Sequence, residues 1–326
     1  MIQNGLIGIG AGAASALLFA SVTSGSLLSI FLFYIAPLPI LIAVLGWSHW
    51  AGMIAAIGAA TGLAAIFGGV FFLAFMAGTG LPAWWLGYLA MLARPAATGA
   101  LHGSAQNAPA ALEWYPAGRL VLWASAFAAL VVIIGVLNLG TDFESYRAAL
   151  HQALDRIIRF TGDDGEQTAP STHAALIDFL VLAIPPAGAV LATITNVTNL
   201  WLAGRIVKFS GRLQRPWPEL PALSFPRPAA LAFVAAVALS FVGGLTGVLA
   251  GVTASSLLIA FGILGFAVLH SLTRGMKGRP LVLSASYASV AIFGWPILAL
   301  CLLGLAEAVA DVRARSARKR GPPATT

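Results

Sequence analysis

Long apolar runs, separated by short polar connections, extend over most of the chain. They lie at residues 5–23, 27–45, 51–77, 81–93, 118–138, 174–203, 229–246, 248–269 and 282–306. A helix of about 20 apolar residues crosses the hydrocarbon layer of a bilayer, so most runs are long enough, whereas 81–93 is too short to span alone. None alternates polar and apolar positions as the strands of a membrane β-barrel do. The pattern predicts an all-α fold, a polytopic membrane helical bundle with eight or nine crossings.

Charged residues gather in two connections of opposite sign. The connection 140–173 holds Asp142, Glu144, Asp155, Asp163, Asp164 and Glu166 against Arg147, Arg156 and Arg159. The connection 205–227 holds Arg205, Lys208, Arg212, Arg215 and Arg227 against Glu219 alone. Because cytoplasmic loops are enriched in Lys and Arg, we expect the first connection outside and the second inside.

Composition agrees with a membrane location. Hydrophobic residues make up 59% of the 326, charged residues only 9%, and the mean hydropathy is +0.91, whereas soluble domains contain about 25% charged residues. We expect one integral membrane domain, 1–326, in the lipid bilayer of the bacterial cytoplasmic (inner) membrane. It contains an outer amphipathic segment at 140–173, a cytoplasmic, proline-rich basic loop at 204–228 and a basic tail at 311–326.

The last apolar run poses a topological conflict. Basic residues precede it at 274–279 and follow it at 313–320, and a single crossing would place these two groups on opposite sides. Two resolutions are open. Either 282–306 re-enters as a short hairpin around Gly294-Trp295-Pro296, or one basic segment violates the positive-inside rule.

The outer segment carries a helix-start signal. Thr141-Asp142-Phe143-Glu144 matches a capping box, in which Thr141 caps the first amides and Glu144 reaches back. A stripe at helical spacing follows, comprising Phe143, Tyr146, Leu150, Leu154 and Ile157. This amphipathic helix has two interpretations, a lid over a binding cavity or a helix resting on the membrane surface.

The run 174–203 is the most informative for function. Pro185-Pro186 removes two amide donors, which predicts an interrupted hydrogen-bond ladder and freed carbonyls at membrane depth. Thr195, Asn196 and Asn199 follow on one helix face. They are candidates for binding a polar solute, and the alternative is hydrogen bonding between helices. Asp178 is a further candidate for solute or proton coupling, or else a solvated helix end.

The first helix carries small residues at a strict four-residue spacing, namely Gly8, Gly12, Ala16 and Ala20. Such a stripe lets another backbone approach closely. It is a candidate docking face for a separate membrane subunit, and the alternative is packing within this chain.

Motifs for catalysis and for metal or nucleotide binding are missing from the sequence. No G-x-x-x-x-G-K-[ST] phosphate loop, histidine ligand pair or G-x-S-x-G elbow occurs. Cys301 is the single cysteine, which excludes a disulfide framework. The basic residues, which give a net charge of +7, form no stripe interleaved with aromatics of the kind that binds nucleic acid. We therefore expect no cofactor, no metal, no nucleic-acid partner and no enzymatic activity.

Three short motifs carry a resemblance to a known family. They are Pro37-Leu38-Pro39-Ile40 at the end of the second helix, Gly278-Arg279-Pro280, and Leu303-Gly304-Leu305-Ala306-Glu307 followed by Arg313. The chain resembles the YybS-like bacterial membrane proteins, which are distantly similar to the substrate-binding S components of energy-coupling-factor transporters and to the rod-shape protein MreD. In S components an A-x-x-x-A pattern on the first helix meets the coupling subunit, and Ala16-Leu17-Leu18-Phe19-Ala20 matches it. The chain departs from S components in having more than six crossings.

Two functions follow from these features. The first is a solute-binding or uptake subunit, which obtains energy from a membrane coupling subunit because the chain has no phosphate loop of its own. The second is a non-transporting scaffold of the cell envelope, similar in class to MreD, which recruits envelope proteins through its cytoplasmic loop.

The opposite charge balances of the two connections give a testable topology. In a variant without Cys301, we expect a cysteine introduced at Ser171 to react with a membrane-impermeant thiol reagent in intact cells, and one at Ser210 to remain unlabelled. Labelling at Ser210 in intact cells would reverse the assignment.

Overall fold

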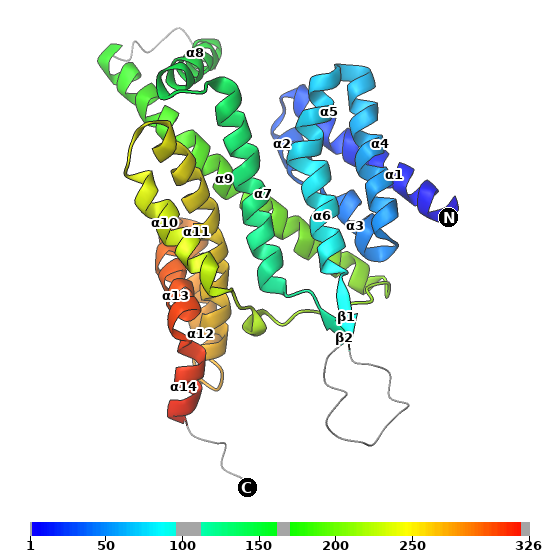
Figure 1. The fold of residues 1–326 in the computed structure, drawn as a ribbon, viewed down its shortest axis with the longest axis vertical. Coiled ribbons are helices and arrows are strands. Elements are labelled where there is room, and N and C mark those ends of the chain that lie inside the picture. Colours follow the sequence, from blue (N-terminus) through cyan, green and yellow to red (C-terminus); the bar gives the residue numbers. More distant parts are fainter. Residues whose placement is uncertain (1, 96–111, 162–169, 321–326) are drawn as a thin grey trace. The chain divides into compact units, whose positions relative to one another are not determined.

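The structure is a computed structural model that describes residues 2–95, 112–161 and 170–320, except for the side chains of 157–161, 170–174 and 319–320. The predicted outer segment and the basic tail therefore lie partly outside the described residues. Helices dominate (Figure 1), and the all-α membrane bundle is confirmed. In the described part of the chain, seven helical stretches are long and apolar enough to cross a membrane. They are Ile2–Ser24, Leu27–Gly46, His49–Phe67, Gly69–Ala90, Ala117–Leu139, Ala175–Phe209 and Gly244–Leu272.

The chain divides into two compact units. Unit 1 comprises Met1–Ala124 and Thr195–Ser224, and unit 2 comprises Ser125–Ile194 and Phe225–Thr326. The predicted single domain of residues 1–326 thus contains two separately packed cores.

Unit 1 is built from the N-terminal helices. These are α1 (Ile2–Ala20), α2 (Leu27–Tyr34), α3 (Leu38–Gly46), α4 (His49–Phe67), α5 (Gly69–Phe75) and α6 (Leu81–Ala90), with the short helical turns Ser21–Ser24 and Met76–Gly80. A small hairpin of β1 (Ala93–Pro95) and β2 (Leu112–Trp114) follows. The start of α7 (Ala117–Leu139), the end of α9 (Pro170–Phe209) and a short turn at Leu220–Ala222 complete the unit.

Two predicted boundaries in unit 1 were wrong. The apolar run 51–77 is not one helix, because α4 ends at Phe67 and Gly68 turns the chain at a φ of 95°. Residues 69–90 then form one span, Gly69–Ala90, which includes the predicted short run 81–93 up to Ala90. A positive φ is accessible to glycine at no steric cost, and the Gly68-Gly69 pair was the overlooked signal.

Pro37 does not close the second helix but divides it. The span Leu27–Gly46 consists of α2 and α3, which are separated at Ile35–Pro37. Two carbonyls at this break accept hydrogen bonds from side chains on other helices. Asn199 Nδ2 donates to Tyr34 O at 2.8 Å, and Ser15 Oγ donates to Ala36 O at 2.6 Å. Side chains from α9 and α1 therefore complete the broken ladder.

Unit 2 contains the remainder of α7, α8 (Phe143–Thr161), the first part of α9, and five C-terminal helices. The last five are α10 (Arg227–Ser240), α11 (Gly244–Leu272), α12 (Arg279–Phe293), α13 (Ile297–Ala310) and α14 (Val312–Arg320). Three of them, α10, α12 and α13, are apolar but shorter than a membrane span. Within unit 2, α8 and α14 lie at opposite ends (Figure 1).

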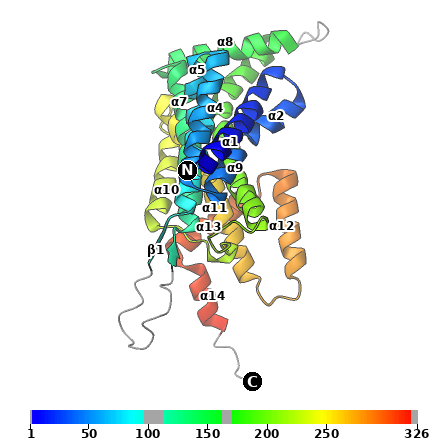
Figure 2. The same ribbon diagram turned by 90° about the vertical axis from the view of Figure 1, so that its right-hand side faces the viewer.

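The hairpin interpretation of the last apolar run agrees with the structure. Gly294, with φ 71°, separates α12 from α13, and the two helices of 15 and 14 residues extend only about 22.5 and 21 Å at 1.5 Å per residue. α13 packs tightly on α11 where Gly265 and Gly304 leave room for the opposing backbone. The α11–α12 connection and α14 consequently lie at the same end of unit 2 (Figure 2). A same-side arrangement of the two basic segments is the one that the positive-inside rule favours.

Helix α8 starts close to the predicted position but with a different cap. Asp142 rather than Thr141 is the capping residue, because its Oδ1 accepts from Ser145 N at 2.9 Å and its Oδ2 from Ser145 Oγ at 2.7 Å. These hydrogen bonds also lower the pKa of Asp142. The predicted stripe does face the core of unit 2: Tyr146 and Leu154 are buried there, with Phe143 and Leu150 packed beside them.

Helix α8 is anchored on α9 at the proline pair. The assigned helix α9 continues through Pro185 and Pro186 rather than ending there. Because Pro185 has no N–H, the carbonyl four residues earlier, on Val181, lacks its helical donor. The Tyr146 hydroxyl donates to that carbonyl at 2.5 Å, and burial raises the Tyr146 pKa to about 12, so the proton stays in place. Arg147 Nη2 adds an ion pair with Asp178 Oδ1 at 2.7 Å.

This arrangement predicts a double-mutant cycle with strong coupling. Tyr146→Phe leaves the buried Val181 carbonyl unpaired, which should cost about 1–3 kcal/mol of stability. In a Pro185→Ala background, the new amide of residue 185 can pair with Val181, so the same substitution should cost much less. Thermal unfolding of the four proteins measures the coupling. Equal costs of Tyr146→Phe in both backgrounds would contradict the assigned role.

Candidate functional site

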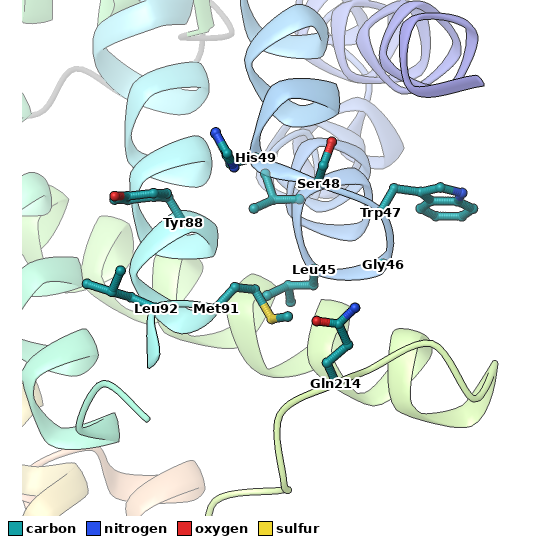
Figure 3. A pocket seen from close by; sticks show the side chains of 10 residues that line it. Leu45, Gly46, Trp47, Ser48, His49, Tyr88, Met91, Leu92 and Gln214 are labelled. Carbon is teal, nitrogen blue, oxygen red and sulfur yellow. The ribbon is translucent and has the colours of Figure 1, made fainter. Parts of the chain in front are cut away.

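A pocket of about 250 Å³ opens in unit 1 between the α3–α4 turn and the end of α6 (Figure 3). We call it the α4–α6 pocket. Its lining residues are Val44, Leu45, Gly46, Trp47, Ser48, His49, Tyr88, Met91, Leu92 and Gln214. They come from three separate stretches of the chain, and each stretch is fixed by a different contact.

The α3–α4 turn is shaped by tight packing and by a helix cap. Gly52 and Gly87 lie so close to Val44 that a larger side chain at either position would collide with it, and α3, α4 and α6 therefore approach closely. Ser48 ends the turn by accepting a hydrogen bond from Ala51 N at 3.2 Å, as an N-cap of α4.

The end of α6 is tied to the start of α4. Trp84 Nε1 donates to His49 O at 3.1 Å, and the Tyr88 ring packs edge-on to His49 with 5.7 Å between ring centroids. His49 and Tyr88 consequently lie on one wall of the pocket, on α4 and α6 respectively (Figure 3).

The basic loop 204–228, called the basic segment from here on, provides the remaining wall. The Arg215 guanidinium donates to Ala90 O at 3.0 Å and to Tyr115 O at 2.8 Å, and burial lowers its pKa. Its neighbour Gln214 reaches from this segment toward Leu45 and Met91 (Figure 3). Arg212 lies over the Trp47 ring at 4.7 Å from the centroid. The pocket therefore sits at the end of unit 1 that carries the basic loop 204–228.

The pocket is lined by hydrogen-bonding side chains and by apolar ones. Ser48, His49, Tyr88 and Gln214 offer hydroxyl, imidazole and amide groups over an apolar floor of Leu45 and Met91. None of the carboxylates in the described part of the chain lines it. Among the described residues, no group of three His, Cys, Asp or Glu side chains is placed to hold a metal ion. The pocket is suited to a small polar molecule held by a few directional contacts.

The predicted polar face of α9 lies elsewhere in unit 1. Asn196 and Asn199 are buried, and Thr195 is half-buried. Asn196 Nδ2 donates to Ala124 O at 3.2 Å, while Asn199 Nδ2 donates to Tyr34 O and to Thr195 O at 2.9 Å. None of these residues lines the α4–α6 pocket. Their contacts fit the interpretation as hydrogen bonding between helices, although Asn199 Oδ1 is buried without a hydrogen-bond partner.

Asp178 belongs to unit 2 and is separated in sequence and in contacts from that polar face. Its carboxylate is 47% exposed and pairs with Arg147 of α8. The Asp178 side chain thus anchors α8 on α9 in this structure.

The small residues of α1 pack within unit 1. A Cβ atom at Gly8 would lie 2.7 Å from Ala51 O, and one at Gly12 would lie 2.6 Å from Ala55 O. Ala16 and Ala20 are half-buried against the same core. α4 therefore occupies the stripe at the glycines, as the internal-packing alternative describes, and docking of a separate subunit on this face remains a prediction.

Sequence reasoning missed the α4–α6 pocket. Its polar residues are single positions in three stretches, and none forms a motif. The available signals were the serine cap at Ser48, and the concentration of aromatic residues at 84–88, which is typical of a membrane interface.

Comparison with known proteins identifies a family. The family model described as "Predicted membrane protein (DUF2232)" matches residues 13–306. The comparisons with curated proteins and with solved structures gave no match.

The asparagine contacts predict unequal effects on stability. Asn196→Ala removes one interhelical hydrogen bond and should cost about 0.6 kcal/mol. Asn199→Ala leaves the Tyr34 carbonyl at the α2–α3 break without its hydrogen-bond donor, which should lower the stability by about 1–3 kcal/mol. Thermal unfolding in detergent measures both, with the exposed Thr198→Ala of the same helix as control. An Asn199→Ala protein as stable as the control would contradict the structural role.

Proposed function

The chain belongs to the DUF2232 family of predicted membrane proteins, and we propose that it is a non-catalytic membrane subunit that binds a small polar solute in the α4–α6 pocket. One observation carries the proposal. The pocket is preformed by three independently fixed stretches and brings four hydrogen-bonding side chains, those of Ser48, His49, Tyr88 and Gln214, around a volume of about 250 Å³. A site of this kind orients a ligand by a few polar contacts over an apolar floor.

The resemblance to S components of energy-coupling-factor transporters supports a role in uptake. The sequence has no phosphate loop, so energy for transport comes from a partner subunit in this proposal. In this proposal the pocket, which lies beside the basic loop 204–228, faces the side on which a solute is released into the cell.

A second function, the envelope scaffold similar in class to MreD, is favoured by a different observation. The basic loop 204–228 is held on unit 1 by the buried Arg215 guanidinium, while Arg205 and Lys208 at its start are exposed. A fixed charged surface of this kind suits recruitment of a partner.

Native mass spectrometry of gently extracted protein distinguishes the two. We expect a retained small molecule in the wild type, and its loss in Gln214→Ala and Tyr88→Phe. Removing one hydrogen-bond partner leaves a polar group of the ligand unpaired, which lowers affinity by up to about a hundredfold.

Gln152→Ala provides a matched control, because Gln152 is an exposed glutamine on α8. The solute proposal fails if the wild type retains no molecule and no polar solute raises its melting temperature. It also fails if the retained molecule survives both pocket substitutions.

A further inference from the structure

The last turn of α9 carries two cations that share one aromatic ring. Arg205 Cζ lies 5.5 Å and Lys208 Nζ 5.4 Å from the centroid of the Trp217 ring. The two residues are three positions apart, so they lie on one face of the helix. Arg205 also lies over Trp201, at 5.9 Å. Cation–π contacts hold both charges in place without neutralising them.

Trp217 packs directly on α9 because the helix has a glycine, Gly204, at the point of contact. A Cβ atom at Gly204 would lie 3.2 Å from Trp217 Cζ3, closer than an ordinary contact. The indole therefore rests directly on the α9 backbone, and the proline-rich segment that carries it is docked there.

Beside these cations lies a groove of about 450 Å³ that is lined by Arg205, Ile206, Lys208 and Phe209. Its apolar side chains are strongly exposed: Phe209 by 97%, Ile206 by 40% and the nearby Trp201 by 55%. Exposed aromatic and aliphatic groups next to unneutralised cations match the boundary between acyl chains and headgroups of a bilayer.

We infer that this groove is a binding site for an anionic phospholipid, with the headgroup phosphate on Arg205 and Lys208 and the acyl chain along Ile206 and Phe209. Charge complementarity supports this occupant. Among the described residues, no carboxylate pairs with Arg205 or Lys208, whose contacts are those with Trp201 and Trp217. Phosphate oxygens accept from guanidinium and ammonium groups in strong, charge-assisted hydrogen bonds.

The position of the groove favours a lipid over a soluble acidic protein. α9 is part of the span Ala175–Phe209, and the groove lies at the last turn of this span, beside the exposed Trp201 ring, a residue type that is enriched where spans meet the membrane surface. No residue of the groove lines the α4–α6 pocket. The inference is therefore independent of solute binding.

The test uses the full-length protein in phosphatidylcholine nanodiscs doped with phosphatidylglycerol, and native mass spectrometry counts the phosphatidylglycerol molecules retained after release. Each basic residue near a membrane surface contributes about fivefold to affinity for anionic lipid. We expect Arg205→Gln with Lys208→Gln to lower the retained phosphatidylglycerol by about 25-fold. Both side chains are exposed, so the fold should be unaffected.

Arg274→Gln with Lys277→Gln is the matched control, because it removes the same charges at the same three-residue spacing. We expect this control to retain phosphatidylglycerol as the wild type does. Trp217→Leu keeps both charges but removes the ring, and we expect it to lower retention as well. An equal loss of retained phosphatidylglycerol in the control pair would show that basic residues attract the lipid in general, and it would overturn the groove as a specific lipid site. Unchanged retention of phosphatidylglycerol in Arg205→Gln with Lys208→Gln would also overturn the lipid site. Displacement of the lipid by added inorganic phosphate would show instead that the site binds free phosphate.

Discussion

Pairing of backbone carbonyls in apolar surroundings is the constraint on which both units depend. A carbonyl that loses its helical donor inside a membrane protein has no water to replace it, and leaving it unpaired costs several kcal/mol. This situation occurs at the α2–α3 break around Pro37 in unit 1, where the carbonyls concerned are those of Tyr34 and Ala36, and at Pro185 in unit 2. Each break is repaired by a side chain from another helix: Ser15 and Asn199 serve the first, and Tyr146 serves the second. The repairs connect helices that are distant in sequence, so a local defect becomes a long-range contact.

The same constraint explains why the sequence alone does not show whether a polar side chain in an apolar run binds a ligand or pairs with a backbone carbonyl. Asn196 and Asn199 have the composition of a ligand-binding face, yet their amide protons are used by Ala124, Tyr34 and Thr195 carbonyls. The α4–α6 pocket forms at the ends of helices instead. There the chain turns, caps such as Ser48 occupy the first amides, and several polar side chains remain free to face a cavity.

Much of the fold could be predicted from periodicity, length and charge. The membrane class follows from apolar runs of about 20 residues, and the same-side placement of the two basic C-terminal segments was one of two stated alternatives. The ends of the helices were harder to predict. The turn at Gly68 depends on a backbone conformation that hydropathy does not report, and the Asp142 cap competes with Thr141 one position away. The pocket could not be predicted, because it depends on tertiary contacts such as those of Arg215 with Ala90 and Tyr115.

The basic segment illustrates how one charge pattern serves different physical roles. From sequence, its arginines and lysine are equivalent contributors to the positive-inside rule. In the structure, Arg215 is turned inward and holds the segment to carbonyls of unit 1, where the end of α6 carries the negative pole of the helix dipole. Arg212 lies over Trp47 beside the pocket, and Arg205 and Lys208 lie over Trp217 at the end of α9. Arg215 is buried and fixes the fold, whereas Arg205 and Lys208 lie on aromatic rings and stay available to an anionic ligand. The net charge of the chain does not reveal this difference.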